Sequence, residues 1–181
     1  PPLDSIELFN PTGGDVNVGG WFLTDDFKSP NRYRIPDGTI LPAGGRLVFD
    51  ESQFNATPGL GTSFSLSSFG DDVYLFSADA AGNLTGYDHG FTLGAAAPGV
   101  PFGRHPLSTG AEDFPAQTSL TPGTTNSGPL IGPVVITEIH YHPVIEGDEF
   151  VEILNLTGAP VNLHDPANPG SPWRINGLDF T

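Results

Sequence analysis

An internal repeat constrains what this chain can fold into more than any other feature of its sequence. The stretch SIELFNPTGGDVNVGGWFLT at 5–24 returns near the other end as FVEILNLTGAPVNLHDPANPGSPWRI at 150–175. Trp21 aligns with Trp173 only if the second copy carries an insertion within Asp165–Pro172. A repeat decides how many structural units a chain contains, so the sequence predicts two related units. The pairs that align at one constant offset include Glu7 and Glu152, Asn10 and Asn155, Thr12 and Thr157, and Val18 and Leu163.

Short alternating apolar runs, separated by turns, predict an all-β chain. The 24 glycines and 19 prolines are spread along the sequence and punctuate these runs. No stretch has a convincing helical period, and one short helical turn within 51–57 is the only exception we expect. The predicted strands are one that contains Ile6 and Leu8, one from Val16 to Leu23, and those at 33–35, 46–50, 64–66, 73–76, 84–91 and 134–139, with a short extended piece at 100–104.

Composition excludes several classes of partner. Six basic and 21 acidic residues give a net charge of −15, so the basic footprint that nucleic-acid binding needs is missing. An anionic membrane surface is disfavoured for the same reason, and without an apolar run of spanning length we expect no membrane insertion. The chain has no Cys, which removes disulfides, thiolate metal sites and a Cys nucleophile. It has no Met either, and we expect a processed or excised piece of something longer.

The composition also divides the chain. We predict a β-sandwich over residues 1–126, a linker at 127–133 with the sequence SGPLIGP, and the N-terminal part of a second such domain at 134–181. An incomplete sandwich of that length buries little apolar surface, so we expect the second unit to dock on the first unit or on another chain.

Several segments, taken in order, carry a resemblance to a known family. The first unit reads IELFNPTGGDVNVGGWFLTDD, IPDGTILPAGGRLVF, FSLSSFGDDVYLF, GNLTGYD, PFGRH and SLTPGTTN, and over residues 4–126 it resembles the lamin tail domain of large bacterial secreted or surface proteins. The second reads VVITEIHYHP, GDEFVEILNLTGAPVNL and INGLDFT. It is similar to the variety that accompanies spore-coat-type kinase-like domains. The resemblance implies an immunoglobulin-like β-sandwich. Without heptads or a prenylation box, the chain does not resemble a nuclear lamin.

Two departures from the family pattern suggest an interaction. The first unit lacks an opening strand like VVITEI, and the second stops before such a domain is complete. A sandwich without its first strand has an open sheet edge, which a strand from elsewhere can fill. Val134–Ile139 is a strand of the right type, for its own first unit or for a neighbouring chain in a head-to-tail polymer. The alternative is that the strand belongs to sequence further upstream. The candidate interaction residues are Val134, Val135, Ile136 and Ile139.

Acidic turns and a histidine pair are weak candidates for a metal site. His140 and His142 lie on one face of the predicted strand, and such a pair can bind zinc, but no third ligand has diagnostic spacing. Asp71 and Asp72, the pair Asp25 and Asp26, and the segment 146–149 are acidic turns that could attract Ca²⁺. They lack the D-x-D-x-D-G pattern of a calcium loop. We therefore predict no metal or other cofactor, with Ca²⁺ as the minority alternative.

Other repeated residues have a structural interpretation. Asn10 and Asn155 precede Gly-containing turns and are predicted to form them. Glu7 and Glu152 lie in predicted strands and are expected to face solvent or to cap backbone amides. Trp21 could stack on a sugar, together with Trp173, Tyr33 and Tyr87, although its place in a strand favours core packing.

No catalytic constellation is present, so we predict no enzyme. The leading hypothesis is a structural or adhesion module of a bacterial extracellular or cell-surface protein that binds protein. The alternatives are a carbohydrate-binding module, which needs an exposed aromatic row, and an accessory domain of a larger secreted enzyme. A solvent-exposed Trp21 would favour the carbohydrate-binding module over the structural module.

Overall fold

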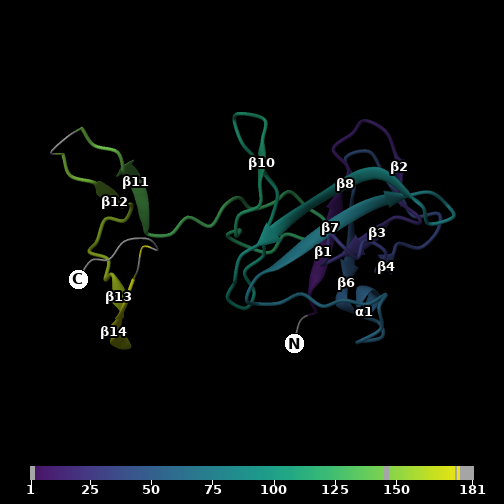
Figure 1. The fold of residues 1–181 in the computed structure, drawn as a ribbon, viewed down its shortest axis with the longest axis horizontal. Coiled ribbons are helices and arrows are strands. Elements are labelled where there is room, and N and C mark those ends of the chain that lie inside the picture. The colour runs from purple at the N-terminus through teal and green to yellow at the C-terminus, as the bar shows by residue number, and fades with distance from the viewer. Residues whose placement is uncertain (1–2, 145–146, 174, 176–181) are drawn as a thin grey trace. The chain divides into compact units, whose positions relative to one another are not determined.

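The chain forms two compact units in the computed structural model, which describes residues 3–144, 147–173 and 175 (Figure 1). The first unit spans Pro1–Leu130 and the second Ile131–Thr181. Both consist of antiparallel strands and turns, and the only helix described has four residues. The all-β prediction is confirmed.

Short paired strands make up the first unit. β1 (Ser5–Phe9) pairs with β6 (Arg46–Asp50), and β2 (Val16–Asn17) pairs with β5 (Ile40–Leu41). A four-stranded sheet has the order β4 (Tyr33–Arg34), β3 (Phe22–Thr24), β7 (Asp71–Ala78) and β8 (Leu84–Leu93). Figure 1 shows β7 and β8 as the longest pair of arrows. A small hairpin joins β9 (His105–Pro106) to β10 (Glu112–Asp113).

The core of the first unit lies between the β1–β6 pair and the four-stranded sheet, as in an immunoglobulin-like sandwich. Alternate side chains of each strand point inward, because successive residues of a strand face opposite sides of a sheet. Leu23 and Ile35 are fully buried, and Leu47 and Val73 pack against the buried cluster. The buried cluster consists of Ile6, Val18, Leu23, Ile35, Leu41, Phe49, Phe54 and Phe64.

Helix α1 (Glu51–Phe54) follows β6 directly and falls within the predicted helical turn. Asp50 caps it, because its carboxylate accepts a hydrogen bond from the N–H of Ser52 at 2.9 Å. The side chain of Gln53 accepts in return from the N–H of Asp50 at 3.0 Å, which completes a capping box. The helix thereby turns Phe54 into the core.

The predicted strand at 64–66 is wrong. Phe64 lies in a loop, with its ring stacked on Phe54 at a centroid distance of 4.7 Å. Its N–H donates to the carbonyl oxygen of Phe54 at 3.2 Å, so it is bonded to the helix and not to a neighbouring strand. The alternation of Phe64 and Leu66 reflects loop residues that turn toward the core, not strand pairing.

The second unit contains two short hairpins. β11 (Val134–His140) pairs with β12 (Phe150–Asn155), with a bulge between Ile136 and Glu138. β13 (His164–Asp165) pairs with β14 (Asn168–Pro172). This second hairpin occupies the predicted insertion. The segment INGLDFT, apart from Ile175, lies outside the described residues, as does Glu146 of the acidic segment.

Hydrogen bonds extend the first unit beyond Asn126. The N–H of Gly128 donates to the side-chain oxygen of Gln117 at 2.8 Å, and the N–H of Leu130 donates to the carbonyl oxygen of Ala116 at 2.7 Å. The division between the units thus falls within the predicted linker at 127–133. The predicted domain boundaries themselves stay a prediction. No helix in the described ranges is long and apolar enough to span a bilayer.

Candidate functional site

Asn10 organises the turn that follows β1. Its side-chain oxygen accepts hydrogen bonds from the N–H and the hydroxyl of Thr12, at 3.0 and 2.7 Å. Its amide donates to the carbonyl oxygens of Gly14, Leu41 and Pro42, at 2.8, 3.0 and 3.1 Å. Asn10 is almost fully buried, so one side chain satisfies the turn and also joins β1 to the end of β5.

Asn155 makes the same local bonds in the second unit. The N–H and the hydroxyl of Thr157 donate to its side-chain oxygen at 2.8 and 2.7 Å, and its amide donates to the carbonyl oxygen of Ala159 at 2.8 Å. The N–H of Trp173 donates to the carbonyl oxygen of Leu163 at 2.8 Å. In the first unit Trp21 and Val18 make the corresponding bond at 3.1 Å. Positions aligned by sequence therefore carry the same hydrogen bonds.

One edge of β1 is open. Backbone groups of alternate residues in an antiparallel ladder point to the same neighbouring strand. The N–H of Asn10 donates to the carbonyl oxygen of Gly45, and the carbonyl oxygen of Asp4 accepts from the N–H of Glu51. Even-numbered residues of β1 therefore face β6. The backbone groups that face the other edge, where no strand is paired among the described residues, belong to Ser5, Glu7 and Phe9.

In the second unit, the edge of β12 that corresponds to the open edge of β1 has a paired strand. The N–H of Leu156 donates to the carbonyl oxygen of Pro133 at 2.8 Å, so even-numbered residues of β12 face β11. These residues align with the odd-numbered residues of β1. β11 therefore lies on the edge of β12 that corresponds to the open edge of β1. The edge that corresponds to the β6 side has no paired strand in the described part of the chain.

The candidate interaction residues lie on β11. Ile136 is opposite Ile153, and Ile139 is opposite Val151. The backbone groups of Ile153 and Val151 point away from β11. In such pairs the backbone groups of both residues point away from each other, so those of Ile136 and Ile139 point to the free edge of β11. Val134 has the same orientation, whereas Val135 faces β12. Ile136 and Ile139 are 51% and 58% exposed, and the two valines are half-buried. Three of the four residues therefore offer backbone groups to a further strand.

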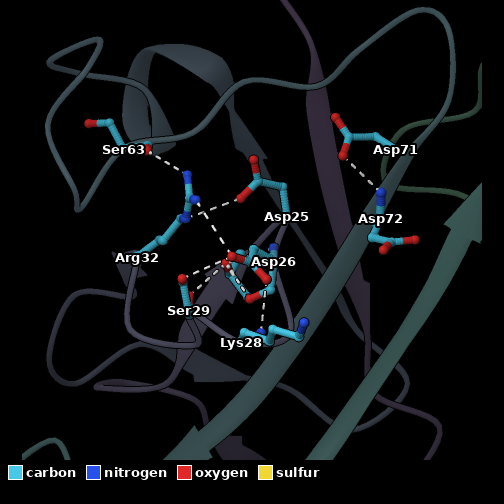
Figure 2. A network of polar contacts seen from close by, with 9 residues as sticks. Asp25, Asp26, Lys28, Ser29, Arg32, Ser63, Asp71 and Asp72 are labelled. Atoms are coloured by element: carbon cyan, nitrogen blue, oxygen red, sulfur yellow. Dashed lines mark hydrogen bonds and ion pairs between the residues drawn. The ribbon is translucent and has the colours of Figure 1, made fainter.

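Arg32 is the centre of a polar network in the first unit. Figure 2 shows the guanidinium of Arg32 between Ser63 and two carboxylates. Arg32 Nε lies 3.2 Å from Asp25 Oδ1, its Nη2 lies 4.0 Å from Asp26 Oδ2, and its Nη1 donates to the carbonyl oxygen of Ser63 at 3.4 Å. The network fastens the 25–32 turn to the 60–64 loop. Sequence reasoning missed Arg32, because its partners are distant in the chain or were interpreted as a solvated turn.

Two neighbouring carboxyls of this network have opposite pKa shifts. Burial raises the pKa of Asp25 above its ordinary value, and the charge of Arg32 only partly opposes that effect. Asp26 accepts hydrogen bonds from the N–H of Lys28 and the hydroxyl of Ser29, both at 2.9 Å. These bonds stabilise the carboxylate and lower the pKa of Asp26. Both carboxyls help to hold the 25–32 turn.

One comparison with known proteins decides the family. The model of the Lamin Tail Domain family matches residues 2–89. Residues 2–89 of this chain are therefore similar to a lamin tail domain. No curated protein and no solved structure matches the chain. The family consists of non-catalytic, immunoglobulin-like domains and indicates a protein-interaction module, and the resemblance is confirmed for the matched residues.

The metal candidates belong to two different units. Asp71, in the lamin tail domain, accepts hydrogen bonds from the N–H groups of Ser67 and Asp72, at 2.8 and 2.9 Å. Figure 2 shows no bond from these two aspartates to the Arg32 network. His140, in the second unit, lies beside the ring of Phe150, with centroids 5.4 Å apart, and His142 follows β11. No three His, Asp or Glu side chains among the described residues are close enough to hold a metal ion together. The weak metal hypothesis stays untested.

A second ion cluster fastens the β9–β10 hairpin to the lamin tail domain. Glu112 Oε1 accepts from Arg104 Nε at 2.6 Å, and Glu112 Oε2 lies 3.1 Å from His89 Nε2. The hydrogen bond from Arg104 is the main reason why the pKa of Glu112 lies below its ordinary value. Beside it, the rings of Phe91 and Phe114 stack at 4.3 Å. The contacts of His89 with Glu112 and of Phe91 with Phe114 each join residues 23 positions apart, and no local pattern could have predicted them.

The aromatic residues give little support to a sugar platform. Trp21 is half-buried and packs against the core cluster, as its strand position predicts. Tyr87 is 52% exposed beside it, with ring centroids 5.8 Å apart and an interplanar angle of 47°. Tyr33 is also half-buried and contacts the ring of Phe49. Among these three aromatic residues of the lamin tail domain, only Tyr87 is well exposed.

Glu7 and Glu152 both accept hydrogen bonds. Glu7 Oε2 accepts from the N–H of Gly123, and its Oε1 lies 3.4 Å from Arg46 Nε. Glu152 Oε1 accepts from the hydroxyl of Thr137 at 2.5 Å. The expected capping of a backbone amide thus occurs at Glu7, and both side chains have a structural role.

Proposed function

We propose that this chain is a structural or adhesion module of a bacterial extracellular or cell-surface protein, and that it joins other protein chains through β-strand edges. The proposal combines the family of the first unit with the open edges of β1 and β11. Main-chain hydrogen bonds provide the affinity in this mode of binding, and the side chains beside them provide the specificity.

The open edges carry the proposal. Ser5, Glu7 and Phe9 offer backbone groups on β1, and the free edge of β11 offers those of Ile136 and Ile139. Pairing of the two edges gives a continuous sheet in the order β12, β11, β1 and β6, shared by two units. Each strand keeps its present partner, so no hydrogen bond within a unit has to break.

The apolar faces of the two hairpins align in this sheet when β11 and β1 run parallel. Ile136 and Ile139 lie on the same face of their hairpin as Ile153 and Val151, because directly opposite residues share a face. The odd-numbered residues of β1 face the joint, so a parallel joint places Ile136 opposite Ile6 or Leu8, which face the core of the first unit. Such a joint would continue one apolar face across the interface and remove exposed isoleucine from water. An antiparallel joint would instead place Ile136 opposite an odd-numbered residue of β1 such as Glu7.

The second unit provides a precedent for the acceptor. β12 aligns with β1 and binds β11 on the edge that is open in β1. A strand of the β1 type thus accepts a strand of the β11 type on this side.

Pairing of β11 of one chain with β1 of the next would give a polymer, because such head-to-tail contacts continue from chain to chain unless a rotation closes a ring. Pairing of β11 with its own first unit is the competing arrangement. The carbohydrate-binding and accessory-domain alternatives have no comparable observation in their favour.

Sedimentation velocity at increasing concentration tests this proposal. The wild-type chain is expected to associate, and Ile136→Pro to remain monomeric, because proline removes an N–H that faces the free edge of β11. The matched variant Val135→Pro removes an N–H that faces β12, so it disrupts the hairpin itself. If Ile136→Pro associates as strongly as the wild type, the proposed edge is wrong. A wild type that stays monomeric at every concentration also overturns assembly between chains.

A further inference from the structure

The four-stranded sheet of the first unit ends in a long strand with a free edge. β8 is the last strand in the order β4, β3, β7 and β8, and no strand among the described residues pairs with its other side. It has ten residues, most of them exposed, and it is the longest strand described. It contains neither Lys nor Pro, the residues that commonly prevent pairing at such an edge. A bulge interrupts its pairing with β7 before residue 88, so the regular part of the edge is 88–93.

The pairing pattern shows which backbone groups face this edge. The N–H of Ile35 donates to the carbonyl oxygen of Trp21 at 2.8 Å, so the odd-numbered residues of β3 face β4 and the even-numbered ones face β7. Even-numbered residues of β3 lie opposite even-numbered residues of β7, so the odd-numbered residues of β7 face β8. These lie opposite odd-numbered residues of β8. The free edge therefore presents the N–H and carbonyl groups of Asp88, Gly90 and Thr92.

The sequence of this edge is complementary to itself in one antiparallel register. When Gly90 lies opposite Gly90 of a second copy, Asp88 lies opposite Thr92 of that copy, and its carboxylate can accept a hydrogen bond from the hydroxyl. In the neighbouring registers Asp88 lies opposite Gly90, Gly94 or another Asp88. Two carboxylates opposite one another are unfavourable, and glycine offers no side-chain donor. Self-pairing centred on Gly90 is thus the register that gives Asp88 a partner.

Gly90 also leaves room for an aromatic contact at the centre of such a pair. A Cβ atom at this position would lie 2.1 Å from a ring carbon of Tyr74, so the ring of Tyr74 lies directly on Gly90. Tyr74 packs with Phe76 on the face of the sheet that points away from the core cluster. Two copies of Gly90 side by side form a strip without side chains, over which the two Tyr74 rings would meet.

We propose that a second copy of this chain pairs with the free edge of β8, antiparallel and two-fold symmetric, with Gly90 at the axis. The contact joins two sheets into one, in the order β4, β3, β7, β8, β8, β7, β3 and β4. The same surface of both copies forms the contact, so it closes as a dimer. It uses neither the β1 nor the β11 edge, and together with those edges it would connect two polymers side by side.

Engineered cysteines test the register, because the chain has no Cys of its own. In the proposed pair the Cα atoms of Asp88 and Thr92 from opposite copies lie about 5.5 Å apart, which suits a disulfide. Asp88→Cys and Thr92→Cys are made separately in the full chain with Ile136→Pro, so that association through β11 does not contribute. Mixed under mild oxidation, they are expected to form a disulfide-linked pair. Either variant alone should not, because equal positions lie roughly 13 Å apart along the strands.

A change of charge tests the same register without a covalent bond. In the Ile136→Pro chain, Thr92→Asp places a carboxylate opposite Asp88 on both sides of the axis, and it is expected to weaken association in sedimentation about tenfold or more. Addition of Asp88→Lys should restore association, because opposite charges then face one another. Thr57→Asp adds the same charge at an exposed loop position away from β8, and it should have little effect.

Each outcome decides for or against the dimer. A mixture that forms disulfides no faster than the single variants overturns the pair, and so does rapid linkage of Asp88→Cys with itself, which indicates another register. Equal weakening by Thr92→Asp and Thr57→Asp also overturns it. Because Ile136→Pro is present in every variant, none of these results depends on the proposed function.

Discussion

The side-chain amide of Asn10 donates to the carbonyl oxygen of Leu41 at 3.0 Å, between the ends of β1 and β5. Asn155 makes the hydrogen bonds within the corresponding turn, but its amide does not bond to another strand among the described residues. The asparagine at this position of the repeat therefore closes a turn in both units, but it connects two strands only in the first.

Asn10→Ala is expected to lower the free energy of unfolding of the first unit by about 1–3 kcal/mol, because buried carbonyl groups lose their donor. Asn155→Ala removes exposed bonds and should change stability by less than about 0.5 kcal/mol. Urea unfolding measures each variant in its own unit, with Trp21 fluorescence in a Trp173→Phe background for Asn10→Ala and Trp173 fluorescence in a Trp21→Phe background for Asn155→Ala. Equal losses would contradict the distinct role of Asn10.

The packing of α1 gives a second prediction. Phe54 is fully buried and stacks on Phe64, so Phe54→Ala is expected to destabilise the first unit by about 3–5 kcal/mol. Phe69 is 92% exposed, and Phe69→Ala should change stability by less than about 0.5 kcal/mol. Thermal unfolding of the two variants compares them directly. A small loss for Phe54→Ala would mean that α1 is not part of the core.

The Arg32 network predicts an order of titration. Asp25 should titrate at higher pH than Asp26, because burial raises the pKa of Asp25 and hydrogen bonds lower that of Asp26. The stabilising contribution of Asp26 is therefore present above its unfolded pKa and is lost as pH falls through its folded pKa. For Asp25 the sign is opposite: its contribution is present below its unfolded pKa and is lost as pH rises through its folded pKa.

Carbon-13 NMR of the side-chain carboxyls measures both titrations in one sample. Asp25→Asn provides the assignment, and it should leave the titration of Asp26 in the low range, because Lys28 and Ser29 still donate to it. A lower pKa for Asp25 than for Asp26 would show that Arg32 outweighs burial at this site.

Charge predicts a salt dependence of assembly. Each chain has a net charge of −15, so two chains repel one another, and salt screens that repulsion. The association constant from sedimentation is expected to rise with ionic strength, as apolar and backbone contacts remain while repulsion falls. An association that weakens with salt would indicate an interface held by ion pairs instead.

The sequence predicts the parts of the fold that depend on local pattern. The alternation in 46–50 and the turn after it predict β6 and α1, and both are confirmed. Phe64 shows the limit, because a loop residue that turns toward the core has the same local pattern as a strand. The alternation of apolar and polar residues shows which side chains point toward the core. It does not show whether the backbone of such a residue pairs with another strand or contacts a helix.

The candidate site depends on information that a sequence pattern lacks. Alternation identified Val134–Ile139 as a strand, but which backbone groups face an open edge depends on the pairing of β11 with β12 and on the bulge after Ile136. Arg32 and Arg104 were missed for a related reason. Arg32 also bonds to Ser63, and the partner of Arg104, Glu112, also contacts His89, and only the folded chain brings these segments together.

Amide hydrogen exchange of the full chain tests edge pairing most directly. The amides of Glu7 and Ile136 face open edges, whereas that of Leu8 faces β6. Edge pairing between chains predicts that Glu7 and Ile136 become protected as the protein concentration rises, while the protection of Leu8 stays nearly constant. Exchange at Glu7 and Ile136 that remains fast and independent of concentration would contradict the account.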